Sequence, residues 1–197
     1  LVWALTSLAG LHEARGQLEE AEGLWREAVE IRRRTYREAR PLVSEILGAY
    51  GSFLVRVGRA PEGEATLRQA VEIDLQVVGP DHTRHAGTLA GLSEALLAQG
   101  ELVQADSAIS RALEIRRAAQ GRTASMVAHH LSVLARIRTR EGRFQEAEAL
   151  LKEALGIVEP HPPRAALPRQ VHAAAAELYQ AWGNPKEAGR HRELAGG

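Results

Sequence analysis

The sequence predicts an all-α fold made of stacked helical hairpins, and its periodic features are the reason. Glycine recurs at intervals of 42, 42, 42 and 41 residues, at Gly16, Gly58, Gly100, Gly142 and Gly183. Alanine follows each glycine twelve residues later, at Ala28, Ala70, Ala112, Ala154 and Ala195. No stretch shows the alternation of apolar and polar residues that is typical of a β-strand. A fixed period of this length indicates repeated units of secondary structure that stack on their neighbours.

Small residues occupy two further columns of the repeat. Five residues after the glycine stand Ala21, Gly63, Ala105, Ala147 and Ala188, and seven residues before it stand Ala9, Gly51, Ser93, Ala135 and Ala176. A small side chain is needed where two helices cross at close range, because a large one would force the backbones apart. The recurring glycine is expected to end the first helix of each pair in a left-handed turn.

The period places two helices in each repeat. In the first pair, one helix is expected to end at residue 15 and the next to cover 18–35. The later pairs are expected at 42–57 with 60–77, 84–99 with 101–119, 124–141 with 143–158, and 167–182 with 185–195. Pro41 opens the second pair at a position where proline is well tolerated. Gly121 breaks the chain before the fourth pair, and the proline-rich segment 159–163 is expected to be a loop before the fifth.

The columns of small residues resemble those of the tetratricopeptide repeat, a pair of antiparallel helices with small residues at its eighth, twentieth and twenty-seventh positions. The three columns fall on those positions when each glycine is placed at the fifteenth. The resemblance covers essentially the whole chain. It implies a single array of about five hairpins in a right-handed α-solenoid, with repeats at about 1–37, 38–79, 80–121, 122–163 and 164–197.

The repeat is about eight residues longer than the common 34-residue form, which makes it similar to the kinesin-light-chain-like subclass. That subclass often carries a Gly-Pro-Asp-His linker, and Gly79-Pro80-Asp81-His82 matches it. The asparagine common in the first helix is absent, since its column holds Ser7, Ala49, Gly91, Val133 and Ala174. The family's clamp on a peptide backbone is therefore not matched by the residue that would make it.

The composition argues against several classes of function. Lys plus Arg and Asp plus Glu number 25 each among 197 residues, and a zero net charge argues against a nucleic-acid surface. There is no cysteine, which excludes disulfides, thiolate catalysis and cysteine-bound zinc. No apolar run approaches the roughly 18 residues that span a bilayer, and the first residues do not read as a signal peptide. We therefore expect a cytoplasmic protein with no nucleic-acid or membrane partner.

The two ends of the chain carry different expectations. The sequence begins at Leu1 without methionine, inside what should be a first helix, so we expect an N-terminally truncated fragment of a longer protein. The first repeat would then lack its neighbour, and self-association through this uncapped repeat is expected. The last helix has His191 and Arg192 where other repeats have an apolar pair, as in a repeat that caps an array.

One local segment carries a second resemblance. Residues 178–188, followed by Arg192, look like the closing repeat of bacterial serine/threonine protein kinases that end in a tetratricopeptide array. The chain itself contains no kinase motif. The resemblance implies a bacterial source and, if the parent is a kinase, a C-terminal interaction or regulatory arm.

Several polar groups have a structural interpretation beside a functional one. His82 and His85 could in principle hold zinc, but no third ligand stands at a partner spacing, and capping of the following helix is the alternative. The arginines at 32–34 and 116–117 fall in last turns, where cations complement the helix dipole. Glutamate recurs near the start of second helices, at Glu20, Glu62, Glu146 and Glu187. We expect no catalytic residue, no metal and no cofactor.

In the tetratricopeptide family the binding surface is the concave face, lined by the first helix of each pair. Carrying its positions onto this chain gives the candidate peptide-binding residues Glu45, Ser52, Arg56, Glu94, His129, Arg136, Arg140 and Glu177, with Thr6, Glu13, Ser132 and Gln180 on the same face. Arg136 and Arg140 lie four apart with no acid at i±4 to neutralise both, which favours an acidic or phosphorylated peptide. The alternatives are that Glu94 and Glu177 reach across from neighbouring repeats, or that the face is only solvated.

The leading interpretation is therefore a non-enzymatic scaffold that binds a protein or peptide on its concave face. The alternative is the C-terminal regulatory or interaction arm of a bacterial signalling enzyme, such as a serine/threonine protein kinase. An intrinsic enzyme ranks below both, because a repeated position is a poor place for a unique catalyst.

Overall fold

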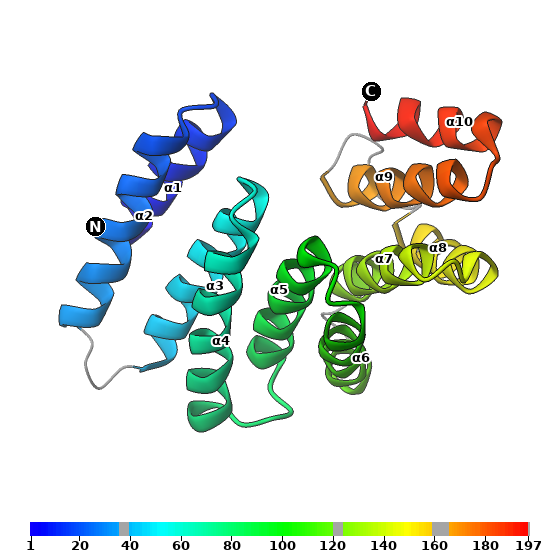
Figure 1. Cartoon of the computed structure of the whole chain (residues 1–197). Helices are drawn as coiled ribbons and strands as arrows, with labels where there is room; N and C mark the ends of the chain where they lie inside the picture. Colours follow the sequence, from blue (N-terminus) through cyan, green and yellow to red (C-terminus); the bar gives the residue numbers. More distant parts are fainter. Residues whose placement is uncertain (36–39, 120–123, 159–165, 197) are drawn as a thin grey trace. The chain divides into compact units, whose positions relative to one another are not determined.

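The computed structural model describes residues 1–35, 40–119, 124–158 and 166–196, and within these ranges the chain is helical and contains no β-strand (Figure 1). The chain divides into two compact units, Leu1–Gln99 and Gly100–Gly197. The first unit contains α1 (Val2–Ala14), α2 (Leu18–Thr35), α3 (Arg40–Arg56), α4 (Ala60–Val77) and α5 (Thr83–Gln99). The second contains α6 (Leu102–Ala118), α7 (Ala124–Arg140), α8 (Phe144–Val158), α9 (Ala166–Ala181) and α10 (Pro185–Ala195).

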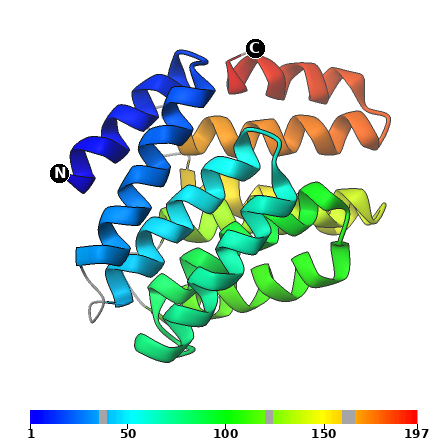
Figure 2. The ribbon, with the colours of Figure 1, turned by 60° about the vertical axis from the view of Figure 1, so that its left-hand side comes forward.

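Helices adjacent in the chain pair as hairpins within each unit. In the first unit α1 packs on α2, and α3 packs on α4; in the second, α7 packs on α8, and α9 on α10 (Figures 1 and 2). The helix bounds agree with the predicted ones to within two residues. The predicted break at Gly121 and the predicted loop at 159–163 lie outside the described residues. No helix in the described ranges is both long and apolar enough to cross a lipid bilayer.

The recurring glycines form the predicted left-handed turns. Gly16, Gly58, Gly100, Gly142 and Gly183 all have φ between 75° and 83°. At Gly16 the next residue completes a typical helix stop, since the N–H of Gln17 donates to the carbonyl of His12 at 2.9 Å. Other side chains are strained at this φ, which explains why glycine marks the period.

The columns of small residues are buried at helix crossings, as predicted. Ala28, Ala70, Ala112 and Ala154 each have 0% of their surface exposed. The last member of the column, Ala195, differs because it lies half-buried at the end of α10. Larger apolar side chains such as Phe53, Ile109 and Leu178 fill the space between crossings.

The helices α3 and α4 cross at close range, with a glycine from each at the crossing. A Cβ atom added to Gly63 would lie 2.8 Å from the carbonyl oxygen of Gly51, and one added to Gly51 would lie 3.1 Å from that of Gly63. The first distance is shorter than real Cβ atoms show, so the helices would have to shift, and the second is tighter than most real Cβ contacts. Glycine in both columns therefore lets these backbones touch.

A stretch of apolar side chains is exposed on α1 and just before it. Leu1, Trp3 and Leu11 are 84%, 80% and 57% exposed. Self-association through the first repeat stays a prediction, and these are the side chains that it would bury.

Candidate functional site

The predicted binding residues lie on α3 and α5 in the first unit and on α7 and α9 in the second.

In the first unit, Arg56 of α3 forms an ion pair with a carboxylate of the same unit. Its Nε and Nη2 donate to the two carboxylate oxygens of Glu13 on α1, at 2.7 and 2.9 Å. A fork-shaped pair of this kind fixes the orientation of both side chains, so Arg56 links two first helices.

The other three residues of the first unit have different surroundings. Ser52 is half-buried between α3 and α5, and a Cβ added to Gly91 of α5 would come within 3.2 Å of its hydroxyl oxygen. Glu94 is half-buried and already takes part in an interaction within the chain. Glu45 is exposed and lines a hollow between α1, α2 and α3, which we call the α1–α3 hollow. The structure therefore leaves Glu45 as the accessible carboxylate among them.

In the second unit Arg136 of α7 and Glu177 of α9 form an ion pair, with 3.0 Å between Nε and Oε2. The prediction that both arginines of α7 lack a counter-ion is therefore wrong for Arg136. The alternative, that Glu177 reaches across from the neighbouring repeat, is confirmed for this arginine. Arg140 lies one turn further along α7 and is exposed. Its side chain forms no ion pair or hydrogen bond with the residues that the structure describes.

His129 and its neighbour differ in their accessibility on α7. His129 is half-buried and has an interaction of its own within the chain, while its backbone carbonyl accepts a 2.7 Å hydrogen bond from the Ser132 hydroxyl. His130 is fully buried, and neither ring nitrogen has a hydrogen-bond partner among the residues that the structure describes. Burial, with His129 and Arg116 nearby, lowers the pKa of His130 to about 3. His130 therefore belongs to the core as a neutral side chain.

A second hollow, of about 480 Å³, lies along α9 and α10 next to the ion pair, and we call it the α9–α10 hollow. Its lining residues are Ala173, Ala176, Glu177, Gln180, Arg192, Ala195 and Gly196. The alanines give it apolar area, while the polar side chains offer donors and acceptors. Gln180 already accepts a hydrogen bond from Arg192. Glu177 belongs both to this hollow and to the pair with Arg136.

Aromatic side chains hold α9 against α8 and α10. The Tyr179 ring stacks on Trp182 and on His191, with centroids 6.3 and 5.6 Å apart. Its hydroxyl donates to Glu148 at 2.9 Å, and burial together with this carboxylate raises the pKa of Tyr179 to about 12. His191 Nδ1 lies 2.9 Å from His172 Nδ1. These contacts fix the position of α9, and with it the side chains of α9 that line the α9–α10 hollow.

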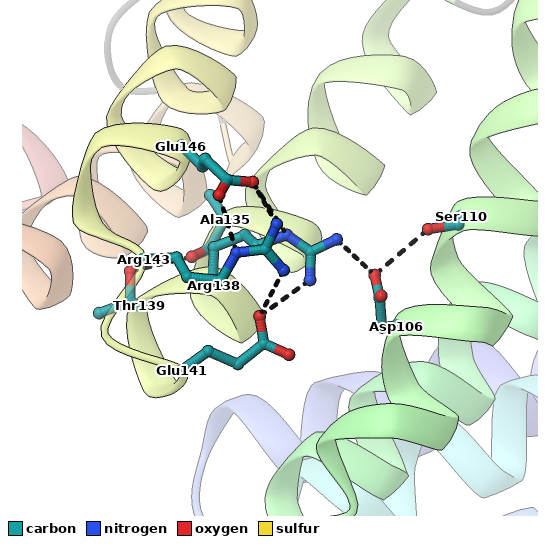
Figure 3. Close-up of polar contacts among 8 residues, drawn as sticks. All are labelled: Asp106, Ser110, Ala135, Arg138, Thr139, Glu141, Arg143 and Glu146. Carbon is teal, nitrogen blue, oxygen red and sulfur yellow. Dashed lines mark hydrogen bonds and ion pairs between the residues drawn. The ribbon is translucent and has the colours of Figure 1, made fainter.

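Arg138 is the centre of an ion-pair network that sequence reasoning missed. Figure 3 shows its guanidinium between Asp106 of α6 and Glu141 after α7, at N–O distances of 2.9 and 3.0 Å. Arg143 pairs with the same Glu141 and with Glu146 of α8. Asp106 is 32 residues from Arg138, so no local pattern indicated the contact. The network fixes the end of α7 on which Arg140 lies.

Two of the recurring glutamates near the second-helix starts, Glu62 and Glu146, form ion pairs at the beginning of their helices. Arg59 pairs with Glu62 in the first turn of α4, as Arg143 does with Glu146 in α8. At α10 the N–H of Glu187 donates to the side chain of Asn184, which caps the helix. An arginine three residues before the glutamate recurs at the starts of α4 and α8, and this spacing is the sequence signal that could have indicated the Arg143–Glu146 pair in the network around Arg138.

The described ranges contain no group of three histidine, aspartate or glutamate side chains that could hold a metal ion. His82 instead accepts a 3.1 Å hydrogen bond from the N–H of Arg84 through Nδ1, at the start of α5. This contact corresponds to the capping role that was the alternative to a zinc ligand.

Family models described as tetratricopeptide repeat match most of the chain. One matches residues 1–39, and another matches residues 42–118 and 86–160. No curated protein matches the sequence.

Solved structures with the same fold cover nearly the whole chain. BtubC (BKLC) from P. vanneervenii has a TM-score of 0.77 at 20% identity, over 99% of this chain and 78% of that chain. A putative kinesin light chain from Podosopora anserina with tetratricopeptide-like repeats has a TM-score of 0.71 at 23% identity, over 98% and 92%. A thermophilic tetratricopeptide repeat protein from Thermus thermophilus has a TM-score of 0.70 at 20% identity, over 99% and 90%. At such identities the likeness shows a shared all-α solenoid fold.

Proposed function

Since the chain belongs to the tetratricopeptide repeat family, we propose that it is a non-enzymatic scaffold that binds a protein or peptide partner on the first helices of its hairpins. Stacked helical repeats present extended surfaces, and such surfaces generally serve to bind other proteins. Within the second unit, α7 and α9 are the helices to which we assign the contact.

One observation carries this assignment. Arg140 is exposed without a counter-ion among the described residues, one turn from the Arg136–Glu177 pair and so near the α9–α10 hollow that Glu177 lines. An unpaired guanidinium favours a carboxylate or phosphate, which it can bind with two parallel hydrogen bonds. Apolar side chains of the same peptide would contact Ala173 and Ala176. The proposed partner is therefore an acidic or phosphorylated segment with apolar residues beside its charge.

The test begins with selection of peptides from a displayed random library on the purified chain. The affinity of each recovered peptide is then measured by calorimetry for the wild type, Arg140→Ala and the control Arg15→Ala. Arg15 is also an exposed arginine at the end of a first helix, but it lies in the first unit. We expect Arg140→Ala to weaken acidic peptides by about threefold to tenfold and Arg15→Ala to have no effect. Equal affinity for all three proteins would refute the assignment to α7 and α9.

A second candidate is the regulatory arm of a bacterial signalling enzyme such as a serine/threonine protein kinase. The segment that carries this resemblance, residues 178–188, contains the end of α9, the turn after it and the start of α10, where Asn184 caps α10 and Pro185 begins it. The reading frame upstream of Leu1 distinguishes the candidates. A kinase domain or another signalling-enzyme domain there supports the arm, and a domain of any other kind removes this candidate while leaving the scaffold function intact.

A further inference from the structure

One face of α1 is exposed, although the matching face of every later first helix is buried. Ala4, Leu8 and Leu11 are spaced by four and then three residues, so they lie on one side of the helix. Leu8 and Leu11 are 43% and 57% exposed, and Ala4 is exposed as well. We call these three residues the α1 stripe. No charged side chain occurs among the first eleven residues, so the stripe is apolar along its whole length.

The repeat identifies the equivalent positions in the other four hairpins. They are Ile46, Tyr50 and Phe53 on α3, Thr88, Leu92 and Ala95 on α5, His130, Leu134 and Ile137 on α7, and Val171, Ala175 and Leu178 on α9. Tyr50 is half-buried, and all the others are buried. Among these five sets the α1 stripe is therefore the one open to solvent.

In the later hairpins, this set of residues is covered by the second helix of the hairpin before. The helices α3, α5, α7 and α9 each pack on the second helix that precedes them. The Phe53 ring lies against Trp25 of α2, with centroids 6.2 Å apart, and the Tyr50 hydroxyl donates to Glu22 of α2 at 3.2 Å. The surface that α1 exposes is thus the one that binds an α-helix elsewhere in the chain.

The covering helices share an apolar residue nine positions after the repeat glycine. These residues are Trp25, Leu67, Ile109 and Leu151, and all four are buried. The last second helix, α10, has Arg192 at this position, and its guanidinium donates to Gln180. Among the described helices, a second copy of the chain therefore offers no uncovered helix of the kind that fits the stripe.

We propose that the α1 stripe binds an amphipathic helix of a partner protein, in the place that a second helix takes on each later first helix. Apolar side chains of that helix, spaced by four residues as Trp25 and Val29 are, lie on Leu8 and Leu11. The contact is apolar and needs no counter-ion from the partner. A single helix face buries less than the roughly 1,200 Å² of a stable interface, so the contact is weak.

This assignment rests on the proposed scaffold function and adds a second class of partner to it. The surface on α7 and α9 takes an acidic segment, whereas the α1 stripe takes a helix with an apolar face. An extended peptide fits the stripe poorly, because its backbone N–H groups would lie against apolar side chains without an acceptor.

A second copy of the chain is the competing occupant. It could place only its own α1 stripe there, and a stripe with alanine at one of three positions buries less apolar surface than a side chain as large as Trp25 does. The experiment below therefore includes self-association as an outcome.

The probe is a helical peptide with the sequence of α2, residues 18–35, acetylated, amidated and stabilised by a hydrocarbon link between positions 23 and 27. Both positions are exposed in α2, so the link leaves the apolar face free. Backbone amide shifts of the ¹⁵N-labelled chain report where it binds. We expect saturable shifts on α1, centred on Leu8 and Leu11. A control peptide with Trp25→Ser and Val29→Ser should bind at least about tenfold more weakly.

Substitutions in the chain complete the test. The double variant Leu8→Gln/Leu11→Gln should weaken binding of the α2 peptide by about tenfold. Both leucines are partly exposed, so the variant should fold, and circular dichroism verifies this. Val103→Gln is the matched control and should bind as the wild type does, because Val103 is an 83% exposed apolar residue of α6. Arg140→Ala should also leave this titration unchanged, so failure here and failure of the α7–α9 surface are recorded separately.

Two titration results overturn the proposal: no shifts on α1 at millimolar peptide, or an affinity that the double variant does not reduce. Sedimentation of the chain without peptide gives the third result. A monomer supports a separate partner, whereas a dimer that the double variant abolishes assigns the stripe to a second copy and overturns the proposal too.

Discussion

Arg136 and Glu177 are 41 residues apart in the sequence, yet the Nε of one lies 3.0 Å from the Oε2 of the other. The pair joins the first helices of two neighbouring hairpins in the second unit. Both side chains are partly exposed, so the pair contributes at most about 1 kcal/mol to stability. Its larger effect is on the binding of a partner, because Glu177 neutralises one of the two arginines, Arg136 and Arg140, that α7 would otherwise offer to an acidic ligand.

Removing the carboxylate of this pair should increase the affinity for acidic peptides. Glu177→Gln releases the guanidinium of Arg136 next to Arg140, and we expect about twofold to fivefold tighter binding of the selected acidic peptides. Calorimetry measures the change. Glu153→Gln is the matched control, because it releases Arg117 from a pair between α6 and α8, which are second helices. Equal affinities for wild type and Glu177→Gln would show that Arg136 does not face the ligand.

The alanine column should not accept larger side chains. Ala112 has no exposed surface, so Ala112→Leu should overpack the crossing and lower the free energy of unfolding by about 1–3 kcal/mol. Ala118→Leu on the same helix is the control, because Ala118 is exposed. Urea denaturation of both variants measures the difference. An Ala112→Leu protein as stable as the control would contradict a close crossing at this column.

The two glycines of the α3–α4 crossing allow a comparison with a glycine in open space. Gly63→Ala places a Cβ 2.8 Å from the carbonyl oxygen of Gly51 and should destabilise the first unit by about 1–3 kcal/mol. Gly23→Ala in α2 has no atom within 4 Å of the new Cβ and should stabilise by about 0.5–1 kcal/mol. The thermal midpoints of the two variants should therefore move in opposite directions, and a shift of the same sign would refute the close approach.

Buried histidine should make the second unit sensitive to acid. An unfolded histidine titrates near 6.5, whereas burial holds the pKa of His130 at about 3. Between these values the unfolded state binds the extra proton, so stability falls as the pH falls. From pH 7 to about pH 4.5 this side chain alone should cost about 2–3 kcal/mol. Burial also lowers the pKa values of His172 and His191, which act in the same direction.

His130→Leu isolates the contribution of that residue. The variant removes a ring whose two nitrogens have no partner in the described ranges, so it should fold at neutral pH and lose less stability in acid than the wild type. Urea denaturation at both pH values gives the comparison. An equal loss of stability in the two proteins would show that His130 is protonated in the folded state.

Most of the fold could be predicted from the sequence because the repeat shows each element several times. A single glycine such as Gly58 is a weak signal, but five in register indicate one turn geometry, and the helix bounds follow from it. The period could not indicate features that occur in one repeat alone. Buried Asp74, which accepts hydrogen bonds from Ser44 and Thr88, joins α3, α4 and α5 in this way.

The candidate site was less predictable, because the repeat specifies which face a residue occupies but does not decide between possible partners such as Glu94 and Glu177. Arg136 and Arg140 have the same local environment in the sequence, yet only Arg136 has a carboxylate within reach among the described residues, from a helix 41 residues away. The α1–α3 hollow gave no signal either, because Trp25 follows the apolar pattern of its column. The Trp25 N–H has no acceptor among the described residues, and this follows only from the packing of Phe53 and the neighbouring helices around the ring.

The most direct test of the central claim is the footprint of a selected peptide on the second unit, read as backbone amide shifts in the nuclear magnetic resonance spectrum. The account predicts that the largest shifts fall on the first helices, around Arg136 and Arg140 of α7 and around Glu177 and Gln180 of α9. Shifts confined to the second helix α8 would contradict it. Failure to recover any peptide that binds the chain would contradict the scaffold function itself.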